Sequence, residues 1–353
     1  MGFRRILLIC VPLLLVAASY GQNGSPDNLP VAPSATKEPA PQQKPAPQAP
    51  EASTAAPSDT AKSTEPSQPS PDDESVSTIR RTVNEVNVVF TVTDKHGHYV
   101  KDLKKDDFRI IDDSKPAAEI RSFRAETDLP LEVGLLIDAS NSVRDRFKFE
   151  QESAVEFLNQ TIRRKYDQAF VIGFDVTPEV TQDFTDNTEA LSNGVRMLRP
   201  GGGTALYDAL YYACRDKLLK VPHTGPVRKA VILLSDGDDN QSHVSREESI
   251  EMAQRAEVIV YTISTNLSGT GSHGDKVLQR IADATGGRSY VPFQLTEVAN
   301  AFAAIQEELR SQYAISYKPA EFRADGRYRS IEIVAQEKGL HVRSRRGYYA
   351  PSQ

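Results

Sequence analysis

The sequence predicts an α/β fold: a Rossmann-like, open, mostly parallel sheet with helices on both faces, inserted between the strands of a smaller all-β domain. Between residues 128 and 312, apolar runs without polar alternation are interleaved with stretches of helical periodicity. Such runs are expected of parallel strands buried on both faces, and repeated β-α alternation is typical of an open sheet covered by helices. Residues 79–127 and 313–353 instead show strand-like runs in which polar and apolar positions alternate.

Residues 1–21 are predicted to be a secretory signal peptide. Arg4 and Arg5 precede an apolar run over residues 6–18, and small residues follow up to Gln22, before which cleavage is expected. The run is shorter than a membrane-spanning helix needs, and no later stretch reaches about 18 apolar residues. We therefore expect an exported mature chain without a membrane span, located in the periplasm, on the cell surface or outside the cell.

Residues 22–78 are predicted to be a disordered linker. They hold 12 of the 22 prolines of the chain, among Ala, Ser, Thr, Gln and Glu residues, and they contain no aromatic residue. A segment of this composition buries too little apolar surface to offset the entropy lost on ordering. We expect it to act as a tether.

The two flanking β segments, residues 79–127 and 313–353, are predicted to complete one Ig-like β-sandwich. Three or four strands from the first segment make only a thin domain, and the second segment supplies further strands. The strand-like runs lie at 83–94, 106–126, 312–320, 327–338 and 340–350. The middle of the chain would then be inserted between the two halves.

The inserted domain, residues 128–312, is predicted to alternate strands and helices over a length that can bury a proper core. Its expected strands lie at 131–138, 168–175, 229–236, 258–265 and 288–291. Its expected helices lie at 147–162, 188–198, 206–220, 246–257, 275–287 and 296–310.

Oxygen-bearing side chains gather where the strands of this domain end. Asp138 ends one apolar strand and Asp236 ends another, while Thr204 lies in a glycine loop that leads into a helix. Ser140 and Ser142 follow Asp138 at alternate positions. Ligands of open α/β sheets bind outside the carboxyl ends of the strands, so we expect these five residues to converge there.

Five converging oxygen side chains with only two carboxylates predict a divalent-cation site. Asp138 and Asp236, held close together at the surface rim, would repel each other, and one would take up a proton unless a cation lay between them. An all-oxygen donor set suits a hard ion such as Mg²⁺, with Mn²⁺ or Ca²⁺ as alternatives.

The same residues carry a family resemblance. The pattern D-x-S-x-S at 138–142, the threonine of "GGGTALYDAL" and the aspartate of "LLSDG" resemble the metal-ion-dependent adhesion site of von Willebrand factor A-type domains. The "ATGGRSY" step is also typical of them. More broadly, residues 80–350 resemble secreted bacterial VWFA-related proteins of the acidobacterial type, on "VVFTVTDKHGHYVKDLKKDDFRIIDD" and "RSRRGYYAP".

The resemblance implies a function in protein binding. It implies that the hydroxyls of Ser140, Ser142 and Thr204 contact the metal, while Asp138 and Asp236 hold it directly or through waters. One coordination position would stay open for a Glu or Asp carboxylate of a protein partner. Two other functions stay open: a metal-free structural scaffold of the cell envelope and, in a different class, a metal-assisted hydrolase.

An enzyme is not the function that the sequence favours. It has no G-x-S-x-G elbow, H-E-x-x-H motif or phosphate loop, and no histidine or spare carboxylate is placed as a general base. The formal net charge of −6 and the lack of a basic run argue against a nucleic-acid partner. The sequence does not indicate the oligomeric state.

Several weaker signals have simpler interpretations. The D-x-D-x-N spacing from Asp236 to Glu247 resembles a calcium loop, but Gln241 stands where that loop needs glycine. The G-x-G-x-x-G pattern at 269–274 is expected to be a surface loop. His96 and His98 are expected in a solvated turn.

Two further residues of the inserted domain, Cys214 and Asp208, have side chains that could bind or support a ligand. Cys214 is expected to be an inert core residue, since it shares helical spacing with neighbouring leucines. For Asp208, one helical turn after Thr204, two readings stay open: support of the metal site, or an ordinary acid at a helix start.

Overall fold

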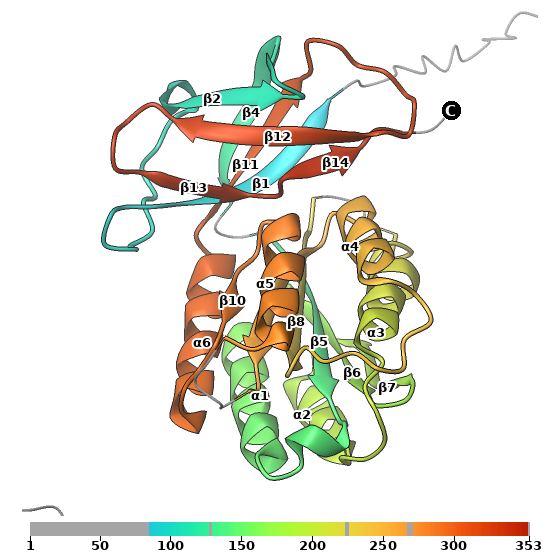
Figure 1. Ribbon diagram of the computed structural model, residues 1–353. Helices are drawn as coiled ribbons and strands as arrows, with labels where there is room; N and C mark the ends of the chain where they lie inside the picture. The colour runs from blue at the N-terminus through green and yellow to red at the C-terminus, as the bar shows by residue number, and fades with distance from the viewer. Residues whose placement is uncertain (1–84, 127–128, 223–225, 267–270, 352–353) are drawn as a thin grey trace, which may run out of the picture. The chain divides into compact units, whose positions relative to one another are not determined.

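The computed structural model describes residues 85–126, 129–222, 226–266 and 271–351 (Figure 1). The predicted signal peptide at 1–21 and the predicted linker at 22–78 lie outside these ranges. All described residues belong to one structural unit, Ser77–Gln353. Among the residues that are described, no helix combines the length and the apolar character that crossing a membrane requires.

A six-stranded sheet forms the centre of the inserted domain and confirms the predicted α/β fold class. Its strands lie in the order β10-β9-β8-β5-β6-β7. Neighbouring strands are parallel except for β6 and β7. The strands are β5 (Leu131–Asp138), β6 (Gln168–Phe174), β7 (Pro178–Thr185), β8 (Arg228–Ser235), β9 (Ile259–Ser264) and β10 (Ser289–Tyr290).

Helices cover both faces of this sheet. The helices are α1 (Phe147–Thr161), α2 (Thr188–Met197), α3 (Leu206–Tyr212), α4 (Arg246–Arg255), α5 (His273–Thr285) and α6 (Leu295–Leu309). Side chains of α1, α2 and α6 pack in one hydrophobic cluster, and those of α3, α4 and α5 pack in a second. A π-helical segment, Ala213–Leu218, continues α3 and holds the buried Cys214.

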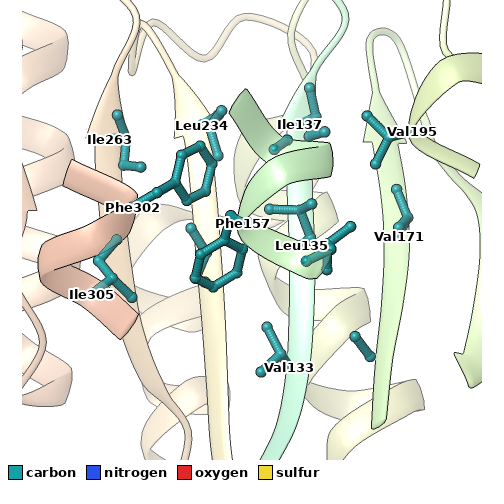
Figure 2. Close-up of a cluster of buried hydrophobic side chains, with 14 of the residues drawn as sticks. Val133, Leu135, Ile137, Phe157, Val171, Val195, Leu234, Ile263, Phe302 and Ile305 are labelled. Carbon is teal, nitrogen blue, oxygen red and sulfur yellow. The ribbon is translucent and has the colours of Figure 1, made fainter. Parts of the chain in front are cut away.

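Strand β5 shows why an unbroken apolar run is needed at the centre of the sheet. Val133, Leu135 and Ile137 face the cluster of α1 and α6, where the rings of Phe157 and Phe302 stack with centroids 4.8 Å apart (Figure 2). Leu136, between them in sequence, belongs to the cluster on the opposite face. Each fully buried side chain of this size contributes about 1.5–3 kcal/mol, so both faces of β5 hold the fold together.

Strand β7 is the one strand of this sheet that the sequence did not predict. It begins at Pro178, pairs antiparallel with β6, and has no fully buried residue. A proline at the first position and a half-exposed pattern fit an edge strand, where neither an unbroken apolar run nor a full ladder is required.

The flanking strands pair across the two ends of the chain. They form two four-stranded sheets, β13-β1-β11-β4 and β14-β12-β2-β3. Their bounds are β1 (Val86–Thr93), β2 (Phe108–Asp112), β3 (Lys115–Pro116), β4 (Glu119–Glu126), β11 (Gln312–Lys318), β12 (Tyr328–Ala335), β13 (His341–Ser344) and β14 (Gly347–Tyr349).

Each of these two sheets contains strands from both ends of the chain. Val88 of β1 lies opposite Ile315 of β11, and Ile110 of β2 lies opposite Ile333 of β12. All four side chains belong to one hydrophobic cluster. The inserted domain therefore leaves and re-enters a shared β-unit; the Ig-like type of that unit stays a prediction.

Candidate metal centre

Two loops leave the sheet side by side at the carboxyl ends of β5 and β8. These strands are parallel neighbours, with Ile137 opposite Leu234, so Asp138 and Asp236 emerge at the same edge. Beyond Asp138 the chain turns, and the Ala139 N–H donates to the carbonyl of Phe174 at the end of β6 (2.8 Å). The fold therefore places both predicted aspartates where sheets of this type bind ligands.

A continuous series of hydrogen bonds connects four of the five predicted residues. The Ser140 N–H donates to Asp138 Oδ1 (2.9 Å), and the Oγ atoms of Ser140 and Ser142 lie 2.9 Å apart. The Ser142 hydroxyl donates to Asp236 Oδ2 (2.6 Å). Ser140 and Ser142 thus bridge the two aspartates.

Thr204 reaches the same place through main-chain contacts. Its N–H donates to Asn240 Oδ1 (3.0 Å), and its carbonyl accepts from the Asn240 N–H (3.0 Å). Two residues earlier, the Gly202 carbonyl accepts from the side chain of Asn141 (3.2 Å), between Ser140 and Ser142. The loop that carries Thr204 is therefore tied to both of the other loops.

The residues of the centre range from fully buried to exposed, so the expectation that both aspartates lie at the surface is wrong for Asp138. Asp138 was expected at the surface rim, but its exposed fraction is 0%. It is the last residue of β5, which has a parallel neighbour on each side, and a serine of β8 also covers it. Asp236 is partly exposed and Ser142 is exposed, so these two residues face the solvent.

Burial, more than repulsion between the two aspartates, controls the charge of Asp138. Burial raises the pKa of Asp138 to about 6, hydrogen bonds from Ser140 and Ser235 oppose this, and Asp236 adds a smaller upward contribution. Repulsion from Asp236, which the sequence analysis expected to raise the pKa of Asp138, is therefore a weaker cause than burial.

The family follows from the sequence of this domain. The family profile of the von Willebrand factor type A domain matches residues 132–308, half of the chain. The chain belongs to this family. The inserted domain is hereafter called the A domain.

Curated relatives match the chain over this part. A protein of Borreliella burgdorferi with no described function is 20% identical over 57% of this chain and 58% of its own length. The calcium-activated chloride channel regulator 1 of Bos taurus is 28% identical over 49% of this chain and 19% of its own. The von Willebrand factor A domain-containing protein 3B of Homo sapiens is 25% identical over 43% and 11%. The chain thus spans less than two thirds of each relative's length.

Solved structures show distant likeness. Proximal thread matrix protein 1 of the mussel byssus aligns with TM-score 0.45 and 16% identity over 62% of this chain and 50% of that one. A second structure of that protein, with a zinc-occupied MIDAS motif, aligns with TM-score 0.45 and 19% identity over 56% and 49%. The vWF domain of the pilus tip protein Mfa5 of Porphyromonas gingivalis aligns with TM-score 0.43 and 16% identity over 52% and 95%.

The A domain adds two residues to the centre that sequence reasoning missed. The Ser235 hydroxyl donates to Asp138 Oδ2 (2.6 Å) and accepts from the Gly237 N–H (3.1 Å). Asn240 holds the main chain of Thr204. The sequence signal for Ser235 is its place at the strand end, beside Asp236. Asn240 stands in the D-x-D-x-N spacing, which indicates a calcium loop and not a contact with Thr204.

The donors of the A domain fit a hard divalent cation. They are hydroxyl and carboxylate oxygens, which Mg²⁺ and similar ions prefer. Within the described ranges, no group of three or more His, Cys, Asp or Glu side chains is placed to hold a metal. A cation at this edge would therefore depend on the serine and threonine hydroxyls and on water, in addition to Asp138 and Asp236.

The weaker signals of the sequence have other contacts in the structure. Asn240 holds Thr204, and Glu247, expected at the end of a calcium loop, lies on α4 and pairs with Arg246 (2.6 Å). At 269–274, residues 269 and 270 lie outside the described ranges, and the Ser272 side chain caps α5 by accepting from the Asp275 N–H. His98 is exposed and its N–H donates to Asp94 (2.9 Å).

Asp208 holds a loop of the A domain in place. Its Oδ1 accepts from the N–H groups of His243 (2.9 Å) and Val244 (3.0 Å), and its Oδ2 lies 2.9 Å from His243 Nδ1. These contacts fix the loop that runs from Asp236 to the start of α4. Asp208 also lies in the first turn of α3, as expected of an acid at a helix start, and its support of the metal site stays a prediction.

Proposed function

We propose that this chain is an exported, metal-dependent protein-binding module. In this proposal, Mg²⁺ or a similar divalent cation is held by the oxygen atoms of Asp138, Ser140, Ser142, Thr204 and Asp236 and captures a carboxylate of an acidic protein partner. The observation that carries the proposal is the continuous hydrogen-bonded path from Asp138 through Ser140 and Ser142 to Asp236.

The residues of the centre have different parts in the proposal. A bound divalent cation would supply positive charge and a coordination position for the partner's carboxylate. Asp138, which accepts hydrogen bonds from Ser140 and Ser235, would contribute a buried negative charge. Asp236 and Ser142 lie at the exposed end, so the partner would approach beside them. Because three of the five proposed donors are neutral hydroxyls, the cation would stay electrophilic, which favours capture of an acidic side chain.

We propose binding and not catalysis. Within the described ranges, the groups that hydrogen-bond to Asp138 and Asp236 are serine hydroxyls and main-chain amides, which do not act as general bases at neutral pH. Assays of hydrolysis on ester, phosphate and peptide substrates, with Mg²⁺ or Mn²⁺ present, test this part. Metal-dependent turnover that is lost in Asp138→Asn would contradict it.

Calorimetric titration of Mg²⁺, Mn²⁺ and Ca²⁺ tests the metal centre. We expect Asp138→Asn and Asp236→Asn to lower the affinity for the preferred ion by about 100-fold or more, because each removes one of two carboxylates. Asp238→Asn is a matched control, since this exposed aspartate lies two residues beyond Asp236. Equal metal affinity in the wild type and both centre variants would exclude the proposed site.

Capture of an acidic group is tested with two short peptides that differ only in Glu against Gln. We expect the Glu peptide to bind in the presence of the preferred ion and to be released by chelator, and the Gln peptide not to bind. Retention of the Glu peptide after chelation would exclude metal-dependent capture. Export is tested separately by sequencing the N-terminus of the mature protein, which we expect to begin at Gln22.

A further inference from the structure

Glu150 is a buried carboxyl group for which the described part of the chain supplies no hydrogen bond. Its exposed fraction is 1%, and among the described residues neither of its Oε atoms has a hydrogen-bond partner. Arg146 Nε lies 3.3 Å from Oε1, which makes an ion pair, but that nitrogen also lacks a hydrogen bond. Buried polar groups are almost always hydrogen-bonded, so Glu150 requires an explanation.

A series of contacts connects Glu150 to the metal centre. Arg146, its ion-pair partner, donates from Nη2 to the hydroxyl of Thr265 (3.4 Å), which follows β9. The Thr265 N–H donates to the carbonyl of Ser235 (3.0 Å), whose hydroxyl in turn donates to Asp138. Glu150, in α1, is therefore connected to Asp138 at the carboxyl-end edge of the sheet.

The electrostatics place Glu150 in the same environment as the two aspartates. Burial raises its pKa to about 8, Arg146 opposes this, and both Asp138 and Asp236 raise the pKa further. When Glu150, Asp138, Asp236 and Arg146 are all ionised, these four groups carry a net charge of −2. A divalent cation carries the charge that would balance them.

We propose that Glu150 is a third acidic group of the metal centre, which increases its affinity for a divalent cation electrostatically and without direct coordination. This inference rests on the proposed function. Charges in a low-dielectric interior interact more strongly than in water, so a buried carboxylate whose charge is felt by Asp138 and Asp236 would also attract a cation held by them. Arg146 has the opposite effect and limits that attraction.

A different explanation is that Glu150 serves only the helix. An acid in the first turn of α1 interacts favourably with the helix dipole, whether or not a metal is present. That role does not require burial, because exposed acids at helix starts have it too. It also predicts equal losses of stability with and without metal, which the experiment distinguishes.

The test is calorimetric titration of Mg²⁺ and Mn²⁺ into the wild type and Glu150→Gln, combined with thermal unfolding of both with and without the ion. Glutamine preserves the shape and removes the charge. We expect about tenfold weaker affinity, as for changes behind other metal sites. We also expect metal-free Glu150→Gln to be as stable as the wild type or more stable. Glu152→Gln, an exposed residue of the same helix, is the control and should alter neither quantity.

Arg146→Gln should change Mg²⁺ affinity in the opposite direction, and it replaces Glu150→Gln as the test if that variant fails to fold. Removing this cationic group should strengthen Mg²⁺ affinity several-fold, whereas loss of a purely structural residue would weaken it. Unchanged affinity in Glu150→Gln, or weaker affinity in Arg146→Gln, overturns the inference while leaving the proposed function intact. A wild type that binds no divalent cation overturns both.

Discussion

The two edges of the A-domain sheet each hold a buried carboxylate, but the groups that hydrogen-bond to it differ. At the amino-end edge, Asp167 is fully buried and accepts hydrogen bonds from the Leu131 N–H (2.9 Å), from Arg163 Nε (3.0 Å) and from Arg310 Nη2 (2.6 Å). At the carboxyl-end edge, Asp138 is equally buried but accepts from the Ser140 N–H and the Ser235 hydroxyl. Two arginines neutralise Asp167, whereas no cationic side chain of the described residues hydrogen-bonds to Asp138.

The pKa shifts follow this difference. Burial alone would raise the pKa of Asp167, but hydrogen bonds from Arg163, Leu131 and Arg310 outweigh it and lower the pKa. Burial raises the pKa of Asp138 to about 6, and its hydrogen bonds do not compensate. The same domain thus supplies arginines to the structural carboxylate Asp167, whereas among the described residues no arginine hydrogen-bonds to Asp138. That difference supports a cation from solution as the partner of Asp138.

The largest effect is expected when each carboxylate is replaced by its amide. Asp167→Asn leaves Arg163 and Arg310 without their anion, and we expect a loss of about 3 kcal/mol in the free energy of unfolding, at the low end for a broken buried pair because both arginines are partly exposed. Metal-free Asp138→Asn should instead gain about 1–2 kcal/mol, since it loses an uncompensated buried charge. Urea unfolding in chelator measures both. Similar losses in the two variants would remove the contrast between the edges.

The pH dependence of stability should differ between the two edges. Asp138 and Glu150 have folded-state pKa values of about 6 and about 8, above 3.8 and 4.5. The folded state therefore binds these protons more tightly, and the stability contributed is present at low pH and is lost as the pH rises through the raised values. Asp167 has a lowered pKa, so its contribution is present above 3.8 and is lost as the pH falls through the lowered value.

Urea unfolding of the metal-free protein across about pH 4 to pH 8 measures this dependence. The difference between wild type and Asp138→Asn isolates one group, and a pKa rise from 3.8 to about 6 corresponds to about 3 kcal/mol at most. We expect the wild type to lose about 2 kcal/mol relative to the variant as the pH rises. Saturating Mg²⁺ should abolish that loss. A difference that does not change with pH would contradict the assignment.

The fold was predictable where burial is complete and local patterns agree with it. The run 131–138 is apolar throughout because β5 is covered on both faces, and its periodicity shows this directly. Strand β7 was not predicted, because an edge strand that starts at Pro178 does not need a continuous apolar run. The pairing of β1 with β11 joins residues more than 200 positions apart, and only the insufficiency of each set of strands indicated it.

The convergence of the predicted residues at one sheet edge could be predicted from the sequence, but the burial of Asp138 could not. Strand ends located Asp138 and Asp236, because the carboxyl ends of parallel strands share one edge. The depth of Asp138 depends on Ser235 and on the Phe174 carbonyl, which come from two other strands. Glu150 carried no signal, because an acid in the first turn of a helix is an ordinary feature of sequences.

Thr204→Ala, with Thr204→Ser as its control, sharpens the account of the carboxyl-end edge. Its main chain is held by Asn240, so the substitution should leave the loop in place. We expect Mg²⁺ affinity to fall by less than about tenfold, because the two carboxylates remain. Capture of the Glu peptide should weaken more than metal binding, if the hydroxyl joins the coordination shell mainly in the ligand-bound state. Equal losses of metal and peptide affinity would contradict this separation of roles.

The smallest effect is expected at Asp208, a carboxylate on the carboxyl-end edge that the protein itself satisfies. Burial would raise the pKa of Asp208, but hydrogen bonds from Val244 and His243 lower it, as arginines do for Asp167. Asp208→Asn keeps one acceptor oxygen for those two N–H groups, so we expect a loss of about 1 kcal/mol or less in the free energy of unfolding. Mg²⁺ affinity should change by less than about threefold, because the loop keeps its anchor. A larger loss of Mg²⁺ affinity with unchanged stability would instead make Asp208 a supporting residue of the metal centre, and the contrast would then lie between satisfied and unsatisfied groups within one edge.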